Sequence, residues 1–583
     1  MLLWIEQTSN NTHYTQYFNR ATSRLPYCFI NYMKKIFLVL FVFLNICAYA
    51  QVPNHLISPV DIPVTLSASF GELRPNHFHS GIDIKTEQQI GLPMYSIDDG
   101  YVWRISISKG GYGNCLYLKH KDVISVYAHL DRFTPEITEW VRDYQYKNKT
   151  FEIDAYLKPN ELPVKQGQQV AWGGNSGSSG GPHLHFEIRD TTGVYVYDAQ
   201  PLYNVYDNVY PRFKNIAINP VSGLGLVDGS AAFKMYGVKR VGTGQYTAPT
   251  IKAWGKIGIE VKAFDYMTGQ NNFYGVKSLK LLVDDKLTFS YTIDKFSLDD
   301  SRYINSFINY GQWQKTRDTF MRCYLLPNNP LPFYTSYNKG YLDINEEKDY
   351  KVRILIADVV GNTSELNFVI KGVQKEIPLV LKDSGTYLDY RFTSIVEGEG
   401  YGMVIPKGSF YDNVYFDHKV KFDSALNANV YQMHYLTEPL QNYARLFIKL
   451  PKDSVPADKH YVARKSRKGD WNYVNTKLYN DSILLAKTNT LGDFTVKVDT
   501  IAPEIRPQSR TSNRILLKLV DKQSGVKRYE GYINGEWVLF EEDFHGRVSY
   551  KVDKKRLKAK RPYNLEFRVY DNCGNMSEYK LKW

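Results

Sequence analysis

Short runs in which apolar and polar residues alternate dominate the chain after residue 51. In the clearest run, residues 183–188, three polar positions alternate with three apolar ones: His183, His185 and Glu187 with Leu184, Phe186 and Ile188. A strand points successive side chains to opposite faces, so the polar three share one face and the apolar three face a core. Clusters of Asp, Asn and Gly separate many of these runs, which is typical of antiparallel sheets joined by tight turns.

The predicted fold class is therefore mainly β and multidomain. At roughly 100–200 residues per domain, the 583 residues make several domains that each bury a core. Residues 114–120 and 123–130 form a predicted hairpin, and residues 135–144 are a candidate helix. We expect an N-terminal antiparallel-sheet domain at 51–215, followed by β-sandwich modules.

The second half of the chain contains a weak internal repeat. Residues 350–365 align without gaps to residues 563–578, and both copies carry the pattern Asp-x-x-Gly-Asn-x-Ser-Glu. In each copy an earlier apolar run leads into an aspartate, Asp265 in one and Asp521 in the other. Two domains are thus predicted, and each closes with a hairpin of the same sequence pattern.

These repeated patterns resemble bacterial immunoglobulin-like modules, which are antiparallel β-sandwiches. We expect such modules at 216–375 and 501–583, with a β-rich module of unknown type at 376–500 between them. Fold predicts function only loosely, so the β modules are interpreted as spacers or as surfaces for a protein partner.

The segment 33–50 has the pattern of a secretory signal peptide. Two lysines precede the largely apolar run 36–46, and Ala-Tyr-Ala follows before Gln51. The run is shorter than the about 20 residues that cross a bilayer, so we expect no membrane span after cleavage. Residues 1–32 are interpreted as the result of a start codon assigned too far upstream, with Met33 as the true start. The alternative is that they form a cytosolic tail on an uncleaved anchor. The mature chain is expected to be exported, to the periplasm or the cell envelope.

The chain is basic, with a formal net charge of +13 and a pI near 9.0. This balance suits an anionic partner, either nucleic acid or an acidic cell-wall polymer. Only one dense basic run occurs, at 554–561, and a single run is more often a solvated face, so we expect no nucleic-acid partner. The cysteines after residue 50 are widely separated and odd in number, which indicates neither a disulfide framework nor a cysteine zinc site: Cys115, Cys323 and Cys573.

Histidine is concentrated in the predicted N-terminal domain. Of twelve histidines in the chain, seven lie within 51–215: His55, His77, His79, His120, His129, His183 and His185. Three short motifs contain the candidates for chemistry: His-Ser-Gly-Ile-Asp from His79 to Asp83, Tyr-Ala-His-Leu around His129, and Gly-Pro-His-Leu-His-Phe-Glu around His183 and His185. Catalytic zinc characteristically takes three ligands, imidazole nitrogen or carboxylate oxygen, and keeps a fourth position for water. One aspartate and two of these histidines satisfy that requirement.

In this order the motifs resemble those of the lysostaphin-type (LytM-like) zinc metallopeptidases, which cut peptide bonds in bacterial peptidoglycan. The resemblance covers about residues 60–205, near a quarter of the chain. It implies a LytM-like peptidase domain in which His79, Asp83 and His185 hold Zn²⁺. It also implies that His129 and His183 flank the water as general base and transition-state stabiliser. The choice of His185 over His183 as ligand comes from the family alone, because both lie on one predicted face.

Glu187 and the oxyanion donor remain open at this stage. Glu187 shares the histidine face and is either a residue that orients a ligand or a structural carboxylate. Some relatives have a tyrosine shortly before the first zinc histidine, but residues 70–76 contain none, so the oxyanion donor has no candidate. We expect residues 134–165, which are longer than a hairpin connection, to wall one side of the cleft.

The expected function is that of an exported zinc endopeptidase acting on peptide cross-links of peptidoglycan, with the β modules positioning it on the wall or on a protein partner. One alternative is an inactive relative that binds peptide and activates another cell-wall hydrolase. Such relatives are expected to lose ligands, whereas all five positions are filled here. A second alternative keeps the enzyme and changes the substrate to secreted proteins.

Overall fold

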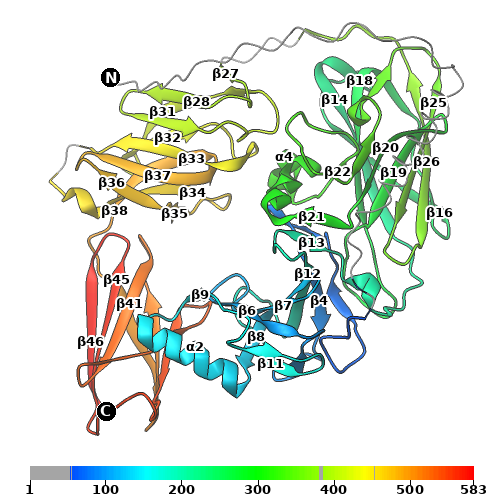
Figure 1. The fold of residues 1–583 in the computed structure, drawn as a ribbon. Coiled ribbons are helices and arrows are strands. Elements are labelled where there is room, and N and C mark those ends of the chain that lie inside the picture. Colours follow the sequence, from blue (N-terminus) through cyan, green and yellow to red (C-terminus); the bar gives the residue numbers. More distant parts are fainter. Residues whose placement is uncertain (1–52, 54, 380–384, 452–453) are drawn as a thin grey trace, which may run out of the picture. The chain divides into compact units, whose positions relative to one another are not determined.

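The computed structural model describes residue 53 and residues 55–379, 385–451 and 454–583. The predicted signal peptide at 33–50 and the residues before it lie outside this described part. Within the described ranges no helix is long and apolar enough to cross a membrane. Strands dominate throughout, so the prediction of a mainly β, multidomain chain is confirmed (Figure 1).

The N-terminal domain is built on an antiparallel sheet whose central strands run in the order β1, β4, β12, β8, β7, β6 and β10. Their bounds are β1 (Leu66–Ala68), β4 (Ile82–Lys85), β12 (His183–Arg189), β8 (Ile124–Phe133), β7 (Asn114–His120), β6 (Gly100–Ile107) and β10 (Pro163–Val164). Shorter strands flank them: β2 (Leu73–Arg74), β3 (His77–Phe78), β5 (Pro93–Tyr95), β9 (Ile153–Tyr156), β11 (Gln169–Gly173) and β13 (Tyr195–Tyr197). The hairpin predicted at 114–120 and 123–130 is formed by β7 and β8.

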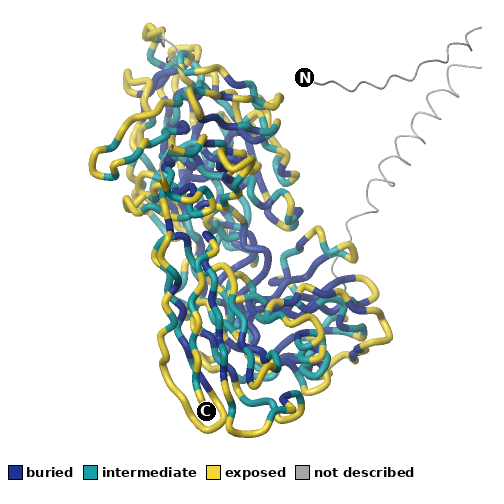
Figure 2. The backbone as a smooth tube through the Cα atoms, turned by 90° about the vertical axis from the view of Figure 1, so that its left-hand side faces the viewer, coloured by how far each residue is buried: buried dark blue, intermediate teal, exposed yellow. Residues whose placement is uncertain are grey.

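The alternation that marks β12 determines which side chains enter the core. Leu184, Phe186 and Ile188 are fully buried, and each such apolar side chain contributes about 1.5–3 kcal/mol on burial. The strand pairs with β4 on one side and β8 on the other, and His185 lies opposite Asp83 on β4. Figure 2 shows buried residues concentrated inside the described parts of the chain and exposed residues at their outer loops.

α2 (Pro135–Asn148) covers the segment predicted as a helix at 135–144 and extends four residues further. It begins with a proline, whose missing N–H removes no helical hydrogen bond in the first turn. Ile137, Val141 and Gln145 recur every four residues and are buried. The apolar pattern did not predict the last turn of the helix, because the buried residue there, Gln145, is polar. Its amide donates to the Phe151 carbonyl at 2.7 Å.

Residues 212–372 form a second sheet in the order β15, β14, β18, β26, β25, β19, β20 and β23. The bounds are β14 (Arg212–Val227), β15 (Lys234–Gly237), β18 (Ile251–Phe264), β19 (Ser278–Val283), β20 (Lys286–Thr292), β23 (Tyr334–Ser336), β25 (Asp349–Ala357) and β26 (Thr363–Gly372). Smaller elements are β16 (Lys239–Gly242), β17 (Gln245–Thr247), β22 (Met321–Arg322), β24 (Leu342–Ile344), α3 (Ile304–Phe307) and α4 (Tyr310–Thr316). β21 (Lys295–Ser297) lies in the same stretch of sequence but pairs with β13 in the N-terminal sheet.

Two pairings in this second sheet, both made by β26, differ from the expected antiparallel arrangement. β26 is antiparallel to its hairpin neighbour β25 but parallel to β17 and β18. Parallel partners are never joined by a tight turn, so the Asp, Asn and Gly signals that predicted the hairpins carry no information about this edge.

The remaining strands form two further groups, each with its own apolar core: one of a two-stranded and two five-stranded sheets, and one of two four-stranded sheets. The first comprises β27 (Thr386–Leu388), β28 (Ser394–Gly398), β29 (Tyr401–Ile405), β30 (Val414–Phe416), β31 (His418–Asp423), β32 (Ala428–Met433), β33 (Pro439–Lys449), β34 (His460–Lys465), β35 (Trp471–Tyr473), β36 (Thr476–Tyr479), β37 (Ile483–Thr490) and β38 (Gly492–Val498). The second comprises β39 (Glu504–Arg510), β40 (Arg514–Val520), β41 (Val526–Ile533), β42 (Glu536–Val538), β43 (Glu541–Glu542), β44 (Arg547–Lys551), β45 (Asn564–Asp571) and β46 (Met576–Lys582). The repeated closing hairpins are β25–β26 and β45–β46.

Candidate active site

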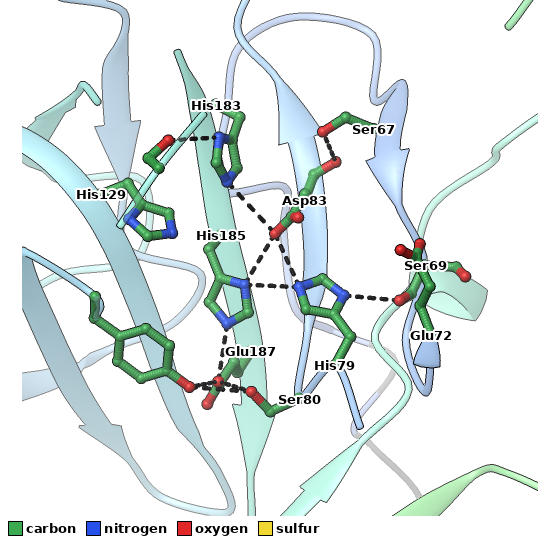
Figure 3. Close-up of polar contacts among 12 residues, drawn as sticks. Ser67, Ser69, Glu72, His79, Ser80, Asp83, His129, His183, His185 and Glu187 are labelled. Atoms are coloured by element: carbon green, nitrogen blue, oxygen red, sulfur yellow. Dashed lines mark hydrogen bonds and ion pairs between the residues drawn. The ribbon is translucent and has the colours of Figure 1, made fainter. Parts of the chain in front are cut away.

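Three side chains that can bind a metal converge beside β4 and β12 (Figure 3). His79 Nε2 lies 3.0 Å from Asp83 Oδ1 and 3.0 Å from His185 Nδ1. His185 Nδ1 lies 2.9 Å from Asp83 Oδ1. All three residues are buried, and the structure thus brings together the three residues for which the sequence predicts a shared metal ion. We call them the His-Asp-His triad.

The donor set of this triad fits Zn²⁺. Two imidazole nitrogens and one carboxylate oxygen are ligand types of catalytic zinc sites. At metal–ligand distances of about 2.0–2.1 Å, tetrahedral angles place neighbouring donors about 3.3 Å apart. The observed separations of 2.9–3.0 Å are close to that value.

Each imidazole of the triad is oriented by a second hydrogen bond. His79 Nδ1 lies 2.7 Å from the Ser69 carbonyl oxygen, and His185 Nε2 lies 2.9 Å from Glu187 Oε1. Both partners are acceptors, so these two ring nitrogens carry hydrogens and donate. The opposite nitrogens, His79 Nε2 and His185 Nδ1, therefore face Asp83 and are the ones that can bind a metal.

Electrostatics within the triad favour a positive charge between the carboxylates. Burial acts to raise the pKa of Asp83, yet the imidazoles of His79 and His185 hold that pKa well below its usual range. Burial acts to lower the pKa of His185, but hydrogen bonds to Asp83 and Glu187 raise it to about 9. The pocket thus stabilises a cation at the point where a metal ion would lie, and metal binding there would displace a proton.

Glu187 is fully buried behind His185 and gathers several donors. Its Oε1 accepts from Ser80 Oγ at 2.5 Å and from the Tyr112 hydroxyl, and its Oε2 accepts from Arg189 Nε at 2.6 Å. Burial acts to raise the pKa of Glu187, but Arg189 and His185 hold it well below its usual range. Of the two interpretations left open by the sequence, the contacts favour a carboxylate that orients His185.

Two more histidines stand beside the triad. The rings of His129 and His183 lie 4.8 Å apart, and His183 Nε2 lies 3.7 Å from Asp83 Oδ1. His129 Nδ1 is 2.9 Å from the Ser176 carbonyl, and His183 Nδ1 is 2.8 Å from the Gly181 carbonyl. Both Nδ1 atoms therefore donate to backbone, and both Nε2 atoms remain available for chemistry.

His129 occupies a distorted point within β8, not the end of a strand as the sequence predicted. β8 continues to Phe133, and the pairing of β7 with β8 shifts register between Asn114 and Leu116, opposite His129. His129 itself has φ of 61°, in the left-handed region that is unfavourable for a residue with a Cβ. This bulge turns the imidazole towards the triad, and strained backbone of this kind clusters at functional sites.

A glycine in the first motif is required by close packing. A Cβ at Gly81 would lie 2.2 Å from the Phe186 carbonyl oxygen and 2.8 Å from Glu187 Cγ. Only glycine therefore lets the segment before β4 approach β12 closely enough for His79 to reach His185.

Tyr112 is the neighbour of the site that the sequence did not single out. Its ring stacks on His185 with centroids 5.1 Å apart, and its hydroxyl lies 3.0 Å from Ser80 Oγ. The signal was the turn Gly-Gly-Tyr-Gly-Asn at 110–114, but nothing in its spacing revealed which strand it covers. Because its hydroxyl also binds Glu187, Tyr112 supports the ligand side of the site.

A cavity of about 660 Å³ lies against Asp83 and His183, within the usual size range of ligand pockets. Its lining comes from residues 62–88 and 180–183, with Arg74 and Lys85 among them. None of residues 134–165, all of which the structure describes, lines this cavity. This cavity is therefore not walled by that stretch, contrary to the expectation from the sequence, and α2 contacts β8 instead.

Comparisons with known proteins give two family matches. The description Peptidase family M23 matches residues 77–146, and the description Zu5-like domain matches residues 385–499. The first match includes His79, Asp83 and His129. The second match falls within residues 376–500, where the sequence predicts a β-rich module of unknown type.

The chain matches only part of the length of each similar protein. Peptidoglycan DD-endopeptidase ShyB of Vibrio cholerae is 32% identical over 142 residues, which is 24% of this chain and 25% of ShyB. Lipoprotein NlpD of Yersinia enterocolitica is 33% identical over 100 residues, which is 17% of this chain and 78% of NlpD. A solved zinc-containing peptidase from Vibrio cholerae is 28% identical, covers 24% of this chain and 37% of that chain, and has a TM-score of 0.18.

Proposed function

Because the chain belongs to peptidase family M23, we propose that its N-terminal domain is a zinc-dependent endopeptidase that hydrolyses peptide cross-links of bacterial peptidoglycan. The observation that carries the proposal is the convergence of His79, Asp83 and His185 on one point, with His129 and His183 beside them. The description of ShyB as a peptidoglycan DD-endopeptidase supports the substrate class.

His79, Asp83 and His185 are the residues proposed to hold Zn²⁺. When bound, the metal supplies Lewis-acid polarisation of the scissile carbonyl and a water of lowered pKa. The chain contributes preorganisation, because the Ser69 carbonyl and Glu187 already hold both imidazoles in the tautomers that bind metal.

His129 is proposed as the general base. Burial, together with the neighbouring imidazoles of His183 and His185, lowers the pKa of His129 to about 4, so the ring is neutral at neutral pH. Its Nδ1–H is fixed by the Ser176 carbonyl, which leaves Nε2 to accept a proton from water and pass it to the leaving amine.

His183 is proposed to stabilise the transition state. Its Nδ1 is anchored by the Gly181 carbonyl, its Nε2 lies 3.7 Å from Asp83 Oδ1, and both residues line the cavity. In its protonated form the ring presents an N–H where negative charge develops on the carbonyl oxygen, a role that preorganised donors perform in acyl transfer.

Digestion of purified peptidoglycan tests the function. The purified chain is incubated with and without chelator, and mass spectrometry identifies new peptide termini. We expect termini that disappear with chelator and in His79→Ala. His77→Ala is the matched control, because His77 is exposed and its side chain, among the described residues, hydrogen-bonds only to the Pro75 carbonyl.

Two outcomes of that digestion separate the alternatives. Zinc-loaded chain that binds peptidoglycan but releases no new termini would point to the inactive, peptide-binding relative. Cleavage of secreted proteins without cleavage of peptidoglycan would point to a protease of secreted proteins. Unchanged turnover in His79→Ala would contradict the proposed site.

The chain is further proposed to act outside the cytoplasm, in the periplasm or cell envelope, with its β modules positioning the peptidase domain on the wall or on a protein partner. The signal-peptide pattern at 33–50 supports export. A reporter enzyme that folds only after export, fused behind residue 50, is expected to be active, and an inactive cytoplasmic fusion would contradict the proposal.

A further inference from the structure

A second cluster of potential ligands lies in the sheet of residues 212–372, outside the candidate active site. Asp207, Asp265 and Asp358 place carboxylate oxygens within 4.8 Å of one another. Asp265 directly follows β18 and Asp358 directly follows β25, whereas Asp207 precedes β14. We call these three residues the aspartate triad; they come from three segments that are far apart in sequence.

Two members of the aspartate triad are fixed by hydrogen bonds from the backbone. Asp207 Oδ1 accepts from the N–H groups of Val209 and Thr268 at 2.9 and 3.0 Å. Asp358 Oδ1 accepts from three successive N–H groups, those of residues 360–362, at 2.7–3.0 Å. These contacts hold the two carboxylates in place and turn them towards Asp265.

Asp265 is the exception. It is 2% exposed, and its Oδ1 is buried without any hydrogen-bond partner. A buried polar atom without a partner typically costs about 1–3 kcal/mol, and more when it is charged. The side chain of Asp265 points into the cluster, because one of its carboxylate oxygens lies within 4.8 Å of an oxygen of each of the other two aspartates.

The aspartate triad has no cationic partner in the part of the chain that the structure describes. Among the described residues, none of the three carboxylates forms an ion pair with a lysine, arginine or histidine. Burial and the neighbouring Asp358 carboxylate raise the pKa of Asp265 to about 8, and burial likewise raises the pKa of Asp358. The fold therefore gathers three acids where only an external cation or a proton can relieve their repulsion.

We propose that Asp207, Asp265 and Asp358 bind a calcium ion that joins the segment before β14 to the ends of β18 and β25. The donors are carboxylate oxygens only, which suits a hard cation. The site lacks the imidazole and thiolate ligands that zinc prefers. Calcium tolerates irregular coordination by six to eight oxygens, whereas magnesium demands near-ideal octahedral geometry at shorter distances.

The C-terminal repeat provides an internal comparison for this site. Asp499, Asp521 and Asp571 occupy the corresponding positions, and their carboxylate oxygens also lie within 4.8 Å of one another. Asp521, the counterpart of Asp265, is half-exposed, and its Oδ1 accepts from the N–H groups of Gln523 and Gly525 at 2.8 and 2.9 Å. The proposal is therefore confined to the first copy, where an oxygen is left without a partner.

Calcium titration of the full chain tests the proposal. Chain stripped of metals is titrated with calcium chloride by calorimetry, and its unfolding temperature is followed with and without calcium. We expect wild type to bind calcium with a rise in unfolding temperature. In Asp265→Asn we expect at least a tenfold loss of affinity, no rise, and an unfolding temperature without calcium that is no lower than that of wild type.

The matched control is Asp521→Asn, which makes the same change at the corresponding position and is expected to keep the calcium response. If Asp265→Asn fails to fold, Asp207→Asn, which alters a half-buried residue, is expected to show the same tenfold loss. Absence of calcium binding by wild type at millimolar concentration, an equal response to magnesium, or an unchanged response in both Asp265→Asn and Asp207→Asn would overturn the proposal.

Discussion

The His-Asp-His triad and the aspartate triad both bring together potential metal ligands from segments that are distant in sequence, but the ligands differ in chemistry. In the first, Asp83 lies between two imidazoles whose outer nitrogens are held by Ser69 and Glu187. In the second, three carboxylates meet and one oxygen of Asp265 has no partner at all. The first site carries its own positive groups, whereas the second depends on a cation from outside.

This difference separates a candidate catalytic metal from a candidate structural one. The His-Asp-His triad adjoins a cavity and has two further histidines that are anchored to the backbone through Nδ1 and not through Nε2, so it can activate water and move protons. The aspartate triad offers oxygen ligands and no proton carrier near neutral pH other than its own carboxylates. Donor type thus points to the metal, and the groups beside the donors point to what the metal does.

The largest effect is expected from His185→Ala. Loss of one of three ligands, together with the unpaired burial of Asp83 and Glu187, should abolish both zinc binding and hydrolysis. Zinc content by mass spectrometry and peptidoglycan turnover measure the two effects. The calcium response is expected to persist, and its loss in this variant would show that the two triads are not independent.

His129→Ala is expected to lower the hydrolysis rate by about 10²–10⁴ without loss of zinc, because a general base contributes that much to proton transfer. Single-turnover kinetics and zinc content on the same sample distinguish the two properties. Loss of zinc in this variant would make His129 a ligand, and an unchanged rate would remove it as the base.

Glu187→Gln is expected to weaken zinc binding by about 10–100-fold, the usual cost of removing a partner that orients a metal-bound histidine. The affinity is measured by competition with a chromophoric chelator. The milder variant Tyr112→Phe removes one hydrogen bond to Glu187 and is expected to have a smaller effect in the same direction. Unchanged affinity in both variants would make Glu187 a purely structural carboxylate.

A smaller effect is expected in the pH dependence of stability. Asp265 has a pKa of about 8 in the folded chain, above its ordinary value of 3.8, so the folded state holds a proton that the unfolded state releases between those values. Without calcium, stability should therefore fall as pH rises from about 4 to about 8. Asp358 and Asp207 face the same group and enhance the effect.

Calcium is expected to oppose that loss, because it binds the deprotonated carboxylates. The difference in unfolding temperature with and without calcium should be larger at pH 8 than at pH 5. In Asp265→Asn both the pH slope and the calcium difference should shrink. A calcium difference that is independent of pH would place the ion elsewhere.

Much of the candidate site followed from local patterns. Alternation in residues 183–188 predicted that His183 and His185 share a face, and the structure has both rings beside Asp83. The resemblance of three motifs supplied the ligand choice between the two. Their nitrogens do differ in the structure, because His185 Nδ1 reaches Asp83 at 2.9 Å and His183 Nε2 remains at 3.7 Å.

Features that depend on the pairing register of distant strands could not be predicted from the sequence. The role of Glu187 requires knowledge that Ser80 and Tyr112 reach the same carboxylate, and no spacing reveals that. The bulge at His129 and the parallel edge between β18 and β26 likewise arise from pairing between distant segments. The aspartates of the repeat were visible as strand-end residues, but Asp207 joins them only through the folded connection before β14.

The most direct measurement is a zinc titration of metal-stripped chain acting on purified peptidoglycan, with new peptide termini counted by mass spectrometry. The account predicts that turnover rises in proportion to added zinc, reaches its maximum at one equivalent per chain, and is absent at every zinc concentration in His79→Ala. Turnover by the metal-free chain, or full activity in His79→Ala at one equivalent of zinc, would contradict it.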